Sequence, residues 1–334
     1  MKRRLISLFF TLCFACVRLL VFAQFEPKKN EKVNVIFDTD FGPDYDDVGA
    51  IAMLHAYADS GYVNILGTIA STRYEGVAAS LDVFNTYFGR PNIPIGVPKH
   101  ALNRRDWQFW SDTVRYKYPH QIKENRVAND AIELYRKILA SQSDNSITII
   151  TVGFFSNIAM LMKSGPDKYS PLNGEQLVNK KVRLMVSMAG VFPKGKEFNV
   201  DRDAESSYYV FRNWKKPILF SGFEIGKKIY TGLELISNDK IKNSPVKDVF
   251  RLCIPKSIHD VKGRMSWDQT TVLVGVKGYE PYYSIKKGRF IIHEDGRNEW
   301  KDDSEGIHAY LVEKSDFKSV EKLIETTMMH IPIR

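Results

Sequence analysis

The stretch Val33–Leu54, VNVIFDTDFGPDYDDVGAIAML, places five aspartates between two apolar runs. The first run, Val33–Phe37, has the β-branched and aromatic residues typical of a strand, and the alanine-containing run that opens at Val48 is typical of a helix. Like charges this close repel one another, so a fold that needed only a turn would not select them. The five acidic residues are Asp38, Asp40, Asp44, Asp46 and Asp47.

Apolar, β-branched runs alternate with helical patterns along most of the chain, as in NVIF, VNILGTIA, SITIITVG, VRLMVSMAG and PILF. This alternation predicts one α/β domain over residues 24–334, with a mostly parallel central sheet and helices on both faces. Two further helices are expected at Val246–His259 and Ser266–Val276, followed by a hairpin or two strands. Reactive groups of such sheets collect at the carboxyl ends of the strands, where the acidic turn lies.

The first 23 residues have the pattern of a secretory signal peptide. MKRR is a basic start, and the apolar run after it ends in Val21-Phe22-Ala23, a small-x-small cleavage pattern. The sequence therefore predicts export, to the periplasm or the medium, with no membrane attachment after cleavage. Loss of Lys2, Arg3, Arg4 and Arg18 lowers the formal charge from +9 to +5. The remaining basic residues are scattered and do not favour nucleic-acid binding.

The acidic turn has three physical interpretations. Helix capping by Asp46, with Asp47 near the positive end of the helix dipole, explains two of the acids at most. A nucleophilic aspartate of the phosphatase type would have threonine where Gly42 stands. A site for a hard cation such as Ca²⁺ or Mg²⁺ fits best, and it needs a further acid from elsewhere. Asp268, alone in the uncharged stretch SWDQT at an expected helix start, is the best candidate.

Four motifs in this order, DTDFGPDYDDVGAIAML, VGFFSNIAML, EFN and SWDQT, resemble the inosine–uridine-preferring nucleoside hydrolase family. The resemblance covers nearly the whole mature chain. It implies an α/β domain that holds one Ca²⁺ and hydrolyses the N-glycosidic bond of ribonucleosides with a water that the metal activates. The partner is thus a small nucleoside or related riboside, and a homo-oligomer is expected because relatives are commonly dimers or tetramers.

The resemblance also implies roles for individual residues. Metal ligands are Asp40, Asp47, the backbone carbonyl of Val152, and Asp268, and Asp40 would also act as the base on the water. Asp46, Glu197 and Asn199 would bind the sugar. The acidic signature is two residues longer than the simplest family pattern, so Asp44 is extra and is the alternative to Asp46.

Trp267 stands where some members of the family place a histidine. Purine-preferring relatives have a tryptophan there, which stacks on the base and favours a protonated purine as the leaving group. Trp267 is therefore predicted to contact the base and assist catalysis, with Trp107 or Trp110 as an opposing ring. The preference expected from this residue is for purine nucleosides.

The sequence departs from the family pattern on the sugar side. The loop VFPKGK before EFN is short and lacks a family asparagine that reaches the 5′ side, which predicts a looser sugar site or a different 5′ substituent. Two alternatives follow. One is a non-catalytic nucleoside- or sugar-binding protein that retains the metal site, and the other is a hydrolase of another N- or O-glycoside.

Overall fold

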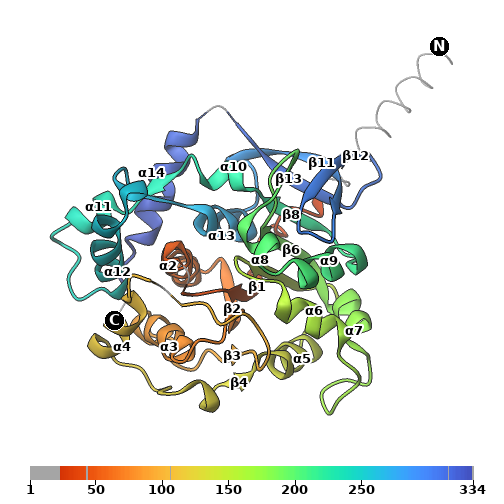
Figure 1. Ribbon diagram of the computed structural model, residues 1–334, viewed down its shortest axis with the longest axis horizontal. Helices are drawn as coiled ribbons and strands as arrows, with labels where there is room; N and C mark the ends of the chain where they lie inside the picture. Colours follow the sequence, from red (N-terminus) through yellow and green to blue (C-terminus); the bar gives the residue numbers. More distant parts are fainter. Residues whose placement is uncertain (1–22, 43, 106, 315, 333–334) are drawn as a thin grey trace.

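The computed structural model describes residues 23–42, 44–105, 107–314 and 316–332. Within these residues eleven strands form one sheet, in the spatial order β4-β3-β2-β1-β5-β6-β8-β13-β11-β12-β7 (Figure 1). The predicted signal peptide falls almost entirely in residues 1–22, which lie outside the described residues. The mostly parallel sheet expected from the sequence is confirmed, because every pairing from β4 to β13 is parallel.

The parallel strands are β4 (Asn129–Asp130), β3 (Ile95–Val97), β2 (Val63–Ala70), β1 (Val33–Thr39), β5 (Ile147–Thr151), β6 (Val182–Met188), β8 (Ile218–Ser221) and β13 (His308–Glu313). The antiparallel edge consists of β11 (Tyr283–Ile292), β12 (Asn298–Asp302) and β7 (Lys194–Gly195). Residues 283–313 thus form three strands, β11, β12 and β13, where a hairpin or two strands were expected. A separate antiparallel pair joins β9 (Tyr230–Thr231) to β10 (Arg264–Met265).

Helices cover both faces of the sheet, as the sequence predicted (Figure 1). One face packs against α2 (Asp46–Asp59), α3 (Val77–Tyr87), α4 (Trp110–Lys117), α10 (Phe223–Gly226), α11 (Leu233–Ser237), α12 (Pro245–Cys253), α13 (Trp267–Lys277) and α14 (Phe317–Met328). The other packs against α5 (Ala131–Ser141), α6 (Ser156–Lys163), α7 (Gly174–Lys181), α8 (Phe198–Arg202) and α9 (Ala204–Asn213). Each face has its own apolar core.

Strand β1 lies in the middle of the sheet and serves both cores. Successive side chains of a strand point to opposite faces, so Val35 and Phe37 enter one core and Ile36 enters the other, all fully buried. Burial on both faces explains why the run reads as continuously apolar rather than alternating. Because β1 ends at Thr39, the residues that follow lie at the carboxyl edge of the sheet.

The helix expected at Val246–His259 is shorter than predicted. Helix α12 ends at Cys253, and the chain continues as short 3₁₀ turns at Ile254–Lys256 and Ile258–Asp260. Pro255 explains the change, because proline lacks the amide hydrogen that would continue the hydrogen bonds of the helix. The helix expected at Ser266–Val276 is present as α13.

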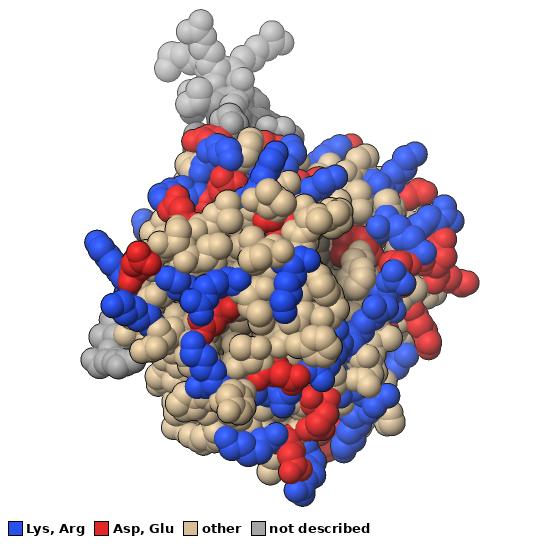
Figure 2. Space-filling model, turned by 60° about the vertical axis from the view of Figure 1, so that its left-hand side comes forward, with Lys and Arg blue, Asp and Glu red and all other residues tan. Residues whose placement is uncertain are grey.

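The surface carries charges of both signs. Figure 2 shows one face of the molecule, on which Lys and Arg side chains are interspersed with Asp and Glu. No helix within the described residues combines the length and the apolar character needed to span a membrane.

Candidate active site

The acidic residues meet in a cavity of about 350 Å³ at the carboxyl edge of the sheet. It is lined by Asp40, Asp44, Asp46, Asp47, Val152, Met188, Glu197, Phe198, Asn199, Phe223, Arg264, Trp267 and Asp268. Nine of the residues predicted for metal, sugar or base are among them, whereas Trp107 and Trp110, the predicted opposing rings, are not. The structure thus brings together side chains from strand ends, from the first turns of α2 and α13, and from α8.

Helix α2 begins directly at the acidic pair. Its first residues are Asp46 and Asp47, and the preceding Tyr45 makes no capping bond through its side chain. The expectation that Asp46 caps the helix from outside was therefore wrong. Both acids lie in the first turn, where the positive end of the helix dipole favours negative charge.

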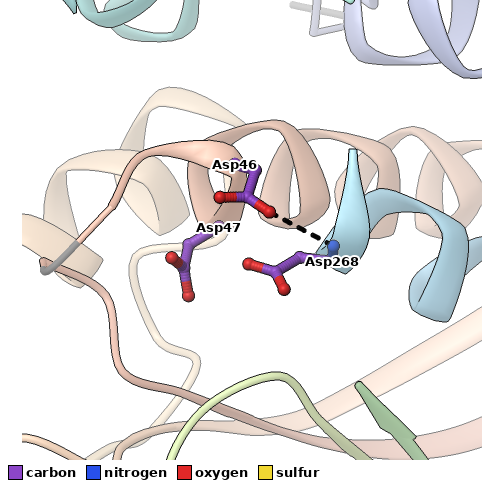
Figure 3. A group of neighbouring side chains, drawn as sticks. All are labelled: Asp46, Asp47 and Asp268. Atoms are coloured by element: carbon purple, nitrogen blue, oxygen red, sulfur yellow. Dashed lines mark hydrogen bonds between the residues drawn. The ribbon is translucent and has the colours of Figure 1, made fainter. Parts of the chain in front are cut away.

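Asp46, Asp47 and Asp268 form a buried acidic triad (Figure 3). One carboxylate oxygen from each lies within 4.8 Å of the others. The amide of Asp268 also donates to Oδ2 of Asp46 at 3.4 Å, which joins α13 to α2. Burial, with repulsion from neighbouring aspartates, raises the pKa of Asp47 and of Asp268 well above the usual range. Such a set of hard oxygen donors fits a divalent cation. A bound cation would lower the pKa values of Asp47 and Asp268 again, because it favours the charged form of each carboxylate.

Asp40 faces the same cavity from the end of β1. Burial raises its pKa well above the usual range, and repulsion from Asp47 is the next largest cause. Gly153 permits this arrangement, because a Cβ there would lie only 2.3 Å from the amide nitrogen of Asp40. Val152, the residue before Gly153, lines the same cavity. Thr39 donates from Oγ1 to Asp47 and links the strand end to the triad.

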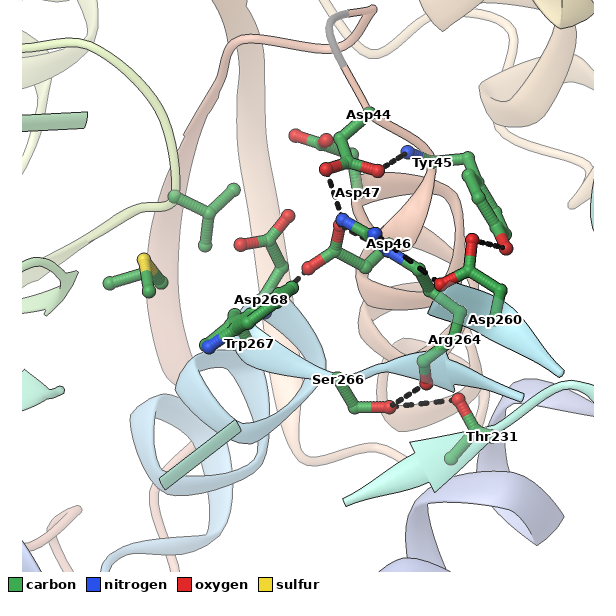
Figure 4. A network of polar contacts seen from close by, with 12 residues as sticks. Asp44, Tyr45, Asp46, Asp47, Thr231, Asp260, Arg264, Ser266, Trp267 and Asp268 are labelled. Atoms are coloured by element: carbon green, nitrogen blue, oxygen red, sulfur yellow. Dashed lines mark hydrogen bonds and ion pairs between the residues drawn. The ribbon is translucent and has the colours of Figure 1, made fainter. Parts of the chain in front are cut away.

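Arg264 is the functional residue that the sequence did not reveal. Its Nε and Nη2 donate to Oδ1 of Asp46 at 3.3 and 2.9 Å, and Nη2 also pairs with Asp44 (Figure 4). Nη1 lies 3.7 Å from Asp260. Pairing of β10 with β9 holds this arginine in place. An arginine, and not only a cation from solution, therefore offsets the repulsion in the acidic turn.

These contacts distinguish Asp44 from Asp46, the two residues that the sequence left as alternatives. Asp44 sits at the edge of the cavity with its side chain 44% exposed, whereas that of Asp46 is 4% exposed. It is Asp46 that reaches Asp47 and Asp268.

Asp38 does not belong to the cavity. Its side chain points to the other face of the sheet, where Oδ2 accepts hydrogen bonds from Tyr135 at 2.8 Å and from Asn157 at 3.0 Å. Burial raises its pKa to about 7. The five aspartates of the signature thus divide into one that supports the core and four that face the cavity.

The EFN motif lies across the cavity from the triad. Glu197 caps α8 by accepting from the amides of Asn199 at 2.9 Å and Val200 at 3.2 Å, and burial raises its pKa to about 7. Nδ2 of Asn199 donates to the Val152 carbonyl at 3.1 Å. Asn199 therefore orients the predicted carbonyl ligand as well as lining the predicted sugar site.

Two aromatic rings form one wall. Trp267 is half-buried, donates from Nε1 to the Phe223 carbonyl at 2.8 Å, and stacks on the Phe223 ring at 5.3 Å between centroids. Phe223 was not anticipated, because nothing in FEIG marks a ligand-facing ring. Trp110 is fully buried and donates to the Asp44 carbonyl at 3.1 Å, so it supports the acidic turn from below. Trp107 is 60% exposed and does not line the cavity.

Comparison with known proteins agrees with this geometry. The profile of the inosine-uridine preferring nucleoside hydrolase family matches residues 35–299, so the chain belongs to that family. It is a nucleoside hydrolase, an N-glycosidase that cleaves the bond between sugar and base. The family is metal-dependent, and the acidic triad is a site of the required chemistry. No curated protein sequence matches the chain.

Solved structures share the fold at low sequence identity. A plant nucleoside hydrolase, PpNRh1, is 18% identical with a TM-score of 0.68, over 90% of this chain and 99% of that one. A purine-preferring ribonucleoside hydrolase from Gardnerella vaginalis is 13% identical with a TM-score of 0.67, over 89% and 98%. The type III effector XopQ, complexed with adenosine diphosphate ribose, is 11% identical with a TM-score of 0.66, over 94% and 98%.

Proposed function

We propose that this protein is a Ca²⁺-dependent hydrolase of ribonucleosides with a preference for purines. The observation that carries the proposal is the buried acidic triad of Asp46, Asp47 and Asp268, with Asp40 and the Val152 carbonyl in the same cavity. A site whose donors are all oxygen atoms favours a hard cation. Ca²⁺ accepts an irregular shell of about six to eight such ligands, which carboxylates and a carbonyl can supply.

Asp40, Asp47, Asp268 and Val152 would hold the cation. When bound, Ca²⁺ would supply positive charge that favours ionisation of water and coordination positions for the ribose hydroxyls. Asp40 would take the proton from the attacking water, since it is buried beside the cluster and has no hydrogen-bonded cation of its own among the described residues. The anionic cluster would also stabilise the positive charge that develops on the sugar ring as the bond to the base breaks.

Asp46 would bind the ribose hydroxyls. Its carboxylate is fixed by Arg264 on one oxygen and by the Asp268 amide on the other, so its orientation is set before substrate arrives. Glu197 and Asn199 would complete the sugar site from α8.

The purine preference rests on the aromatic wall of Trp267 and Phe223. Both residues line the cavity, and aromatic contact area of this kind suits a bicyclic base better than a pyrimidine. The Gardnerella vaginalis structure is that of a purine-preferring enzyme, and XopQ is complexed with adenosine diphosphate ribose. Both support a ribosyl ligand with a purine in this fold.

The test is ribose release from inosine, adenosine, guanosine, uridine and cytidine by the purified mature chain, with Ca²⁺ and with chelator. We expect release from purine nucleosides that depends on Ca²⁺ and falls by at least about a thousandfold in Asp40→Asn, the range of a lost general base with its charge. Asp303→Asn is the matched control, because Asp303 is a partly buried aspartate that pairs with Arg289 and does not line the cavity. Equal turnover with chelator would contradict the metal dependence, and faster release from uridine would contradict the purine preference.

Export is part of the proposal. The basic start and the apolar run before Gln24 support a cleaved signal peptide. The amino terminus of the protein recovered from the producing cell should be Gln24, as read by mass spectrometry. A mature protein that retains Met1 would contradict it.

A further inference from the structure

Three cationic side chains stand over aromatic rings at the mouth of the cavity. The guanidinium carbons of Arg104 and Arg202 lie 5.8 and 5.5 Å from the centroid of the Phe198 ring. The ammonium nitrogen of Lys227 lies 5.5 Å from the centroid of the Phe223 ring. Both rings line the cavity, and Phe198 is 43% exposed. Positive charge therefore lies beside these two rings, whereas the buried end of the cavity carries the acidic triad.

None of these three cations has a carboxylate partner in the part of the chain that the structure describes. Their neighbours in sequence do, since Arg105 pairs with Asp112 and Lys228 pairs with Glu313. A basic side chain without an acidic partner beside a cavity raises the local concentration of anions and can bind one directly. Stacking on a ring holds a guanidinium while leaving its N–H edge available to such an anion.

The two arginines are tied to the elements that build the cavity. The amide of Arg104 donates to Oγ1 of Thr72 at 3.0 Å, and Thr72 is buried just beyond the carboxyl end of β2. Arg202 is the last residue of α8, the helix that Glu197 caps. Both cations are thus held next to the EFN motif rather than carried on unattached loops.

We propose that the preferred substrate carries a phosphoryl group on the 5′ oxygen of its ribose, bound by Arg104 and Arg202 beside the Phe198 ring. This proposal rests on the proposed function, because that function fixes how the sugar lies. The 2′ and 3′ hydroxyls face the acidic triad, and the base leaves from C1′ along the aromatic wall. The 5′ carbon is the remaining direction, and the EFN motif with its two flanking arginines lies on the sugar side.

The negative charge of the phosphoryl group requires that it bind away from the acidic triad, at the mouth of the cavity. A phosphate near the acidic triad would be repelled, whereas an arginine pair binds phosphate through short charge-assisted hydrogen bonds. The reaction itself is unchanged: the oxygen of water bonds to C1′, the C1′–N bond breaks, and the departing base takes up a proton. The phosphoryl group remains on the sugar, so the products are a ribose 5-phosphate compound and the free base.

Steady-state kinetics with inosine and inosine 5′-monophosphate test the proposal on the full mature chain with Ca²⁺. The wild-type kcat/KM should be at least about tenfold higher for the 5′-monophosphate, and this ratio should fall as salt screens the charges. In the double variant Arg104→Gln/Arg202→Gln the ratio should fall to near one. Arg212→Gln is the matched control, because Arg212 is an exposed arginine 5.2 Å from the Tyr208 ring centroid, outside the cavity.

A wild-type enzyme that hydrolyses inosine as well as its 5′-monophosphate would overturn the inference and leave the proposed function standing. A double variant that keeps the preference would overturn it too. If neither compound is hydrolysed, the proposed function fails for these substrates, and calorimetric titration of the Ca²⁺-loaded protein with ribose 5-phosphate and ribose decides the inference separately. Tighter binding of the phosphate that is lost in the double variant supports it, and equal binding of the two sugars refutes it.

Discussion

Arg264 donates two hydrogen bonds to a single oxygen of Asp46, from Nε at 3.3 Å and from Nη2 at 2.9 Å. The other oxygen of Asp46 accepts from the Asp268 amide at 3.4 Å. This carboxylate is therefore held on both sides by residues that lie more than two hundred positions away in sequence.

Loss of Arg264 should weaken substrate binding without weakening calcium binding. A hydrogen bond to a charged group contributes about 1.5–3 kcal/mol, so Arg264→Gln should raise KM for a nucleoside by roughly ten- to a hundredfold. Calcium affinity, measured by calorimetry, should stay the same or increase, since a positive charge leaves the neighbourhood of the triad. Arg289→Gln, which breaks an exposed pair with Asp303, serves as the control. A parallel fall in calcium affinity would mean that Arg264 only supports the local fold.

Asp268 should be needed for tight binding of calcium. Asp268→Asn removes one negative charge from the triad, and calcium affinity should fall by at least about tenfold because affinity depends on the number of charged ligands. Calcium at a hundred times its Kd should stabilise the wild type by about 2.7 kcal/mol, and thermal melting with and without chelator measures this. The same calcium concentration should stabilise the variant far less. An unchanged difference between the two melting curves would exclude Asp268 as a ligand.

Activity should depend on the ionisation of Glu197. Burial raises its pKa to about 7, and both of its oxygens accept backbone amides, which favours the ionised form for binding a sugar hydroxyl. At saturating Ca²⁺, kcat/KM should therefore rise as the pH increases towards about 7 and level off above it. The inflection should be absent from Glu197→Gln. An inflection that persists in this variant would assign the titration to another group.

Gly49 should be needed for the spacing of α2 and α13. A Cβ at this position would lie 2.4 Å from Nε2 of Gln269, which is fully buried in α13. Alanine normally favours a helix over glycine by about 1 kcal/mol, but here overpacking should destabilise the fold by roughly 1–3 kcal/mol. Urea unfolding measures the change, and calcium affinity should fall with it. Gly165→Ala, where the added atom meets nothing within 4 Å, is the control.

Much of the fold was predictable because its signals are local. Continuous apolar runs such as Val33–Phe37 indicated buried parallel strands, and turn signals indicated the antiparallel hairpin of β11 and β12. The edge strand β7 escaped prediction because it joins β12 from more than a hundred residues earlier in the chain. Asp268 could be anticipated because it is the lone charge in the stretch SWDQT, a motif that resembles the family. Its place beside Asp47 agrees with that reasoning.

Other parts of the site could not be predicted, since they depend on long-range contacts. An arginine in GRMSWDQT looks like any surface charge until β9 and β10 pair and turn it towards Asp46. Phe223 gains its place only by stacking on Trp267. Asp38 looked like a member of the acidic turn, but the pleat of β1 directs it to Tyr135 and Asn157 on the opposite face.

The first turns of α2 and α13, rather than the turn between β1 and α2, determine where the triad carboxylates stand. Asp46 and Asp47 belong to one helix and Asp268 to the other, and Gly49 allows the two helices to touch. Insertions and deletions between Asp40 and Asp46 would therefore leave the spacing of these three carboxylates intact. Such changes would alter the rim of the active site, where Asp44 stands, and with it the ligands that can enter.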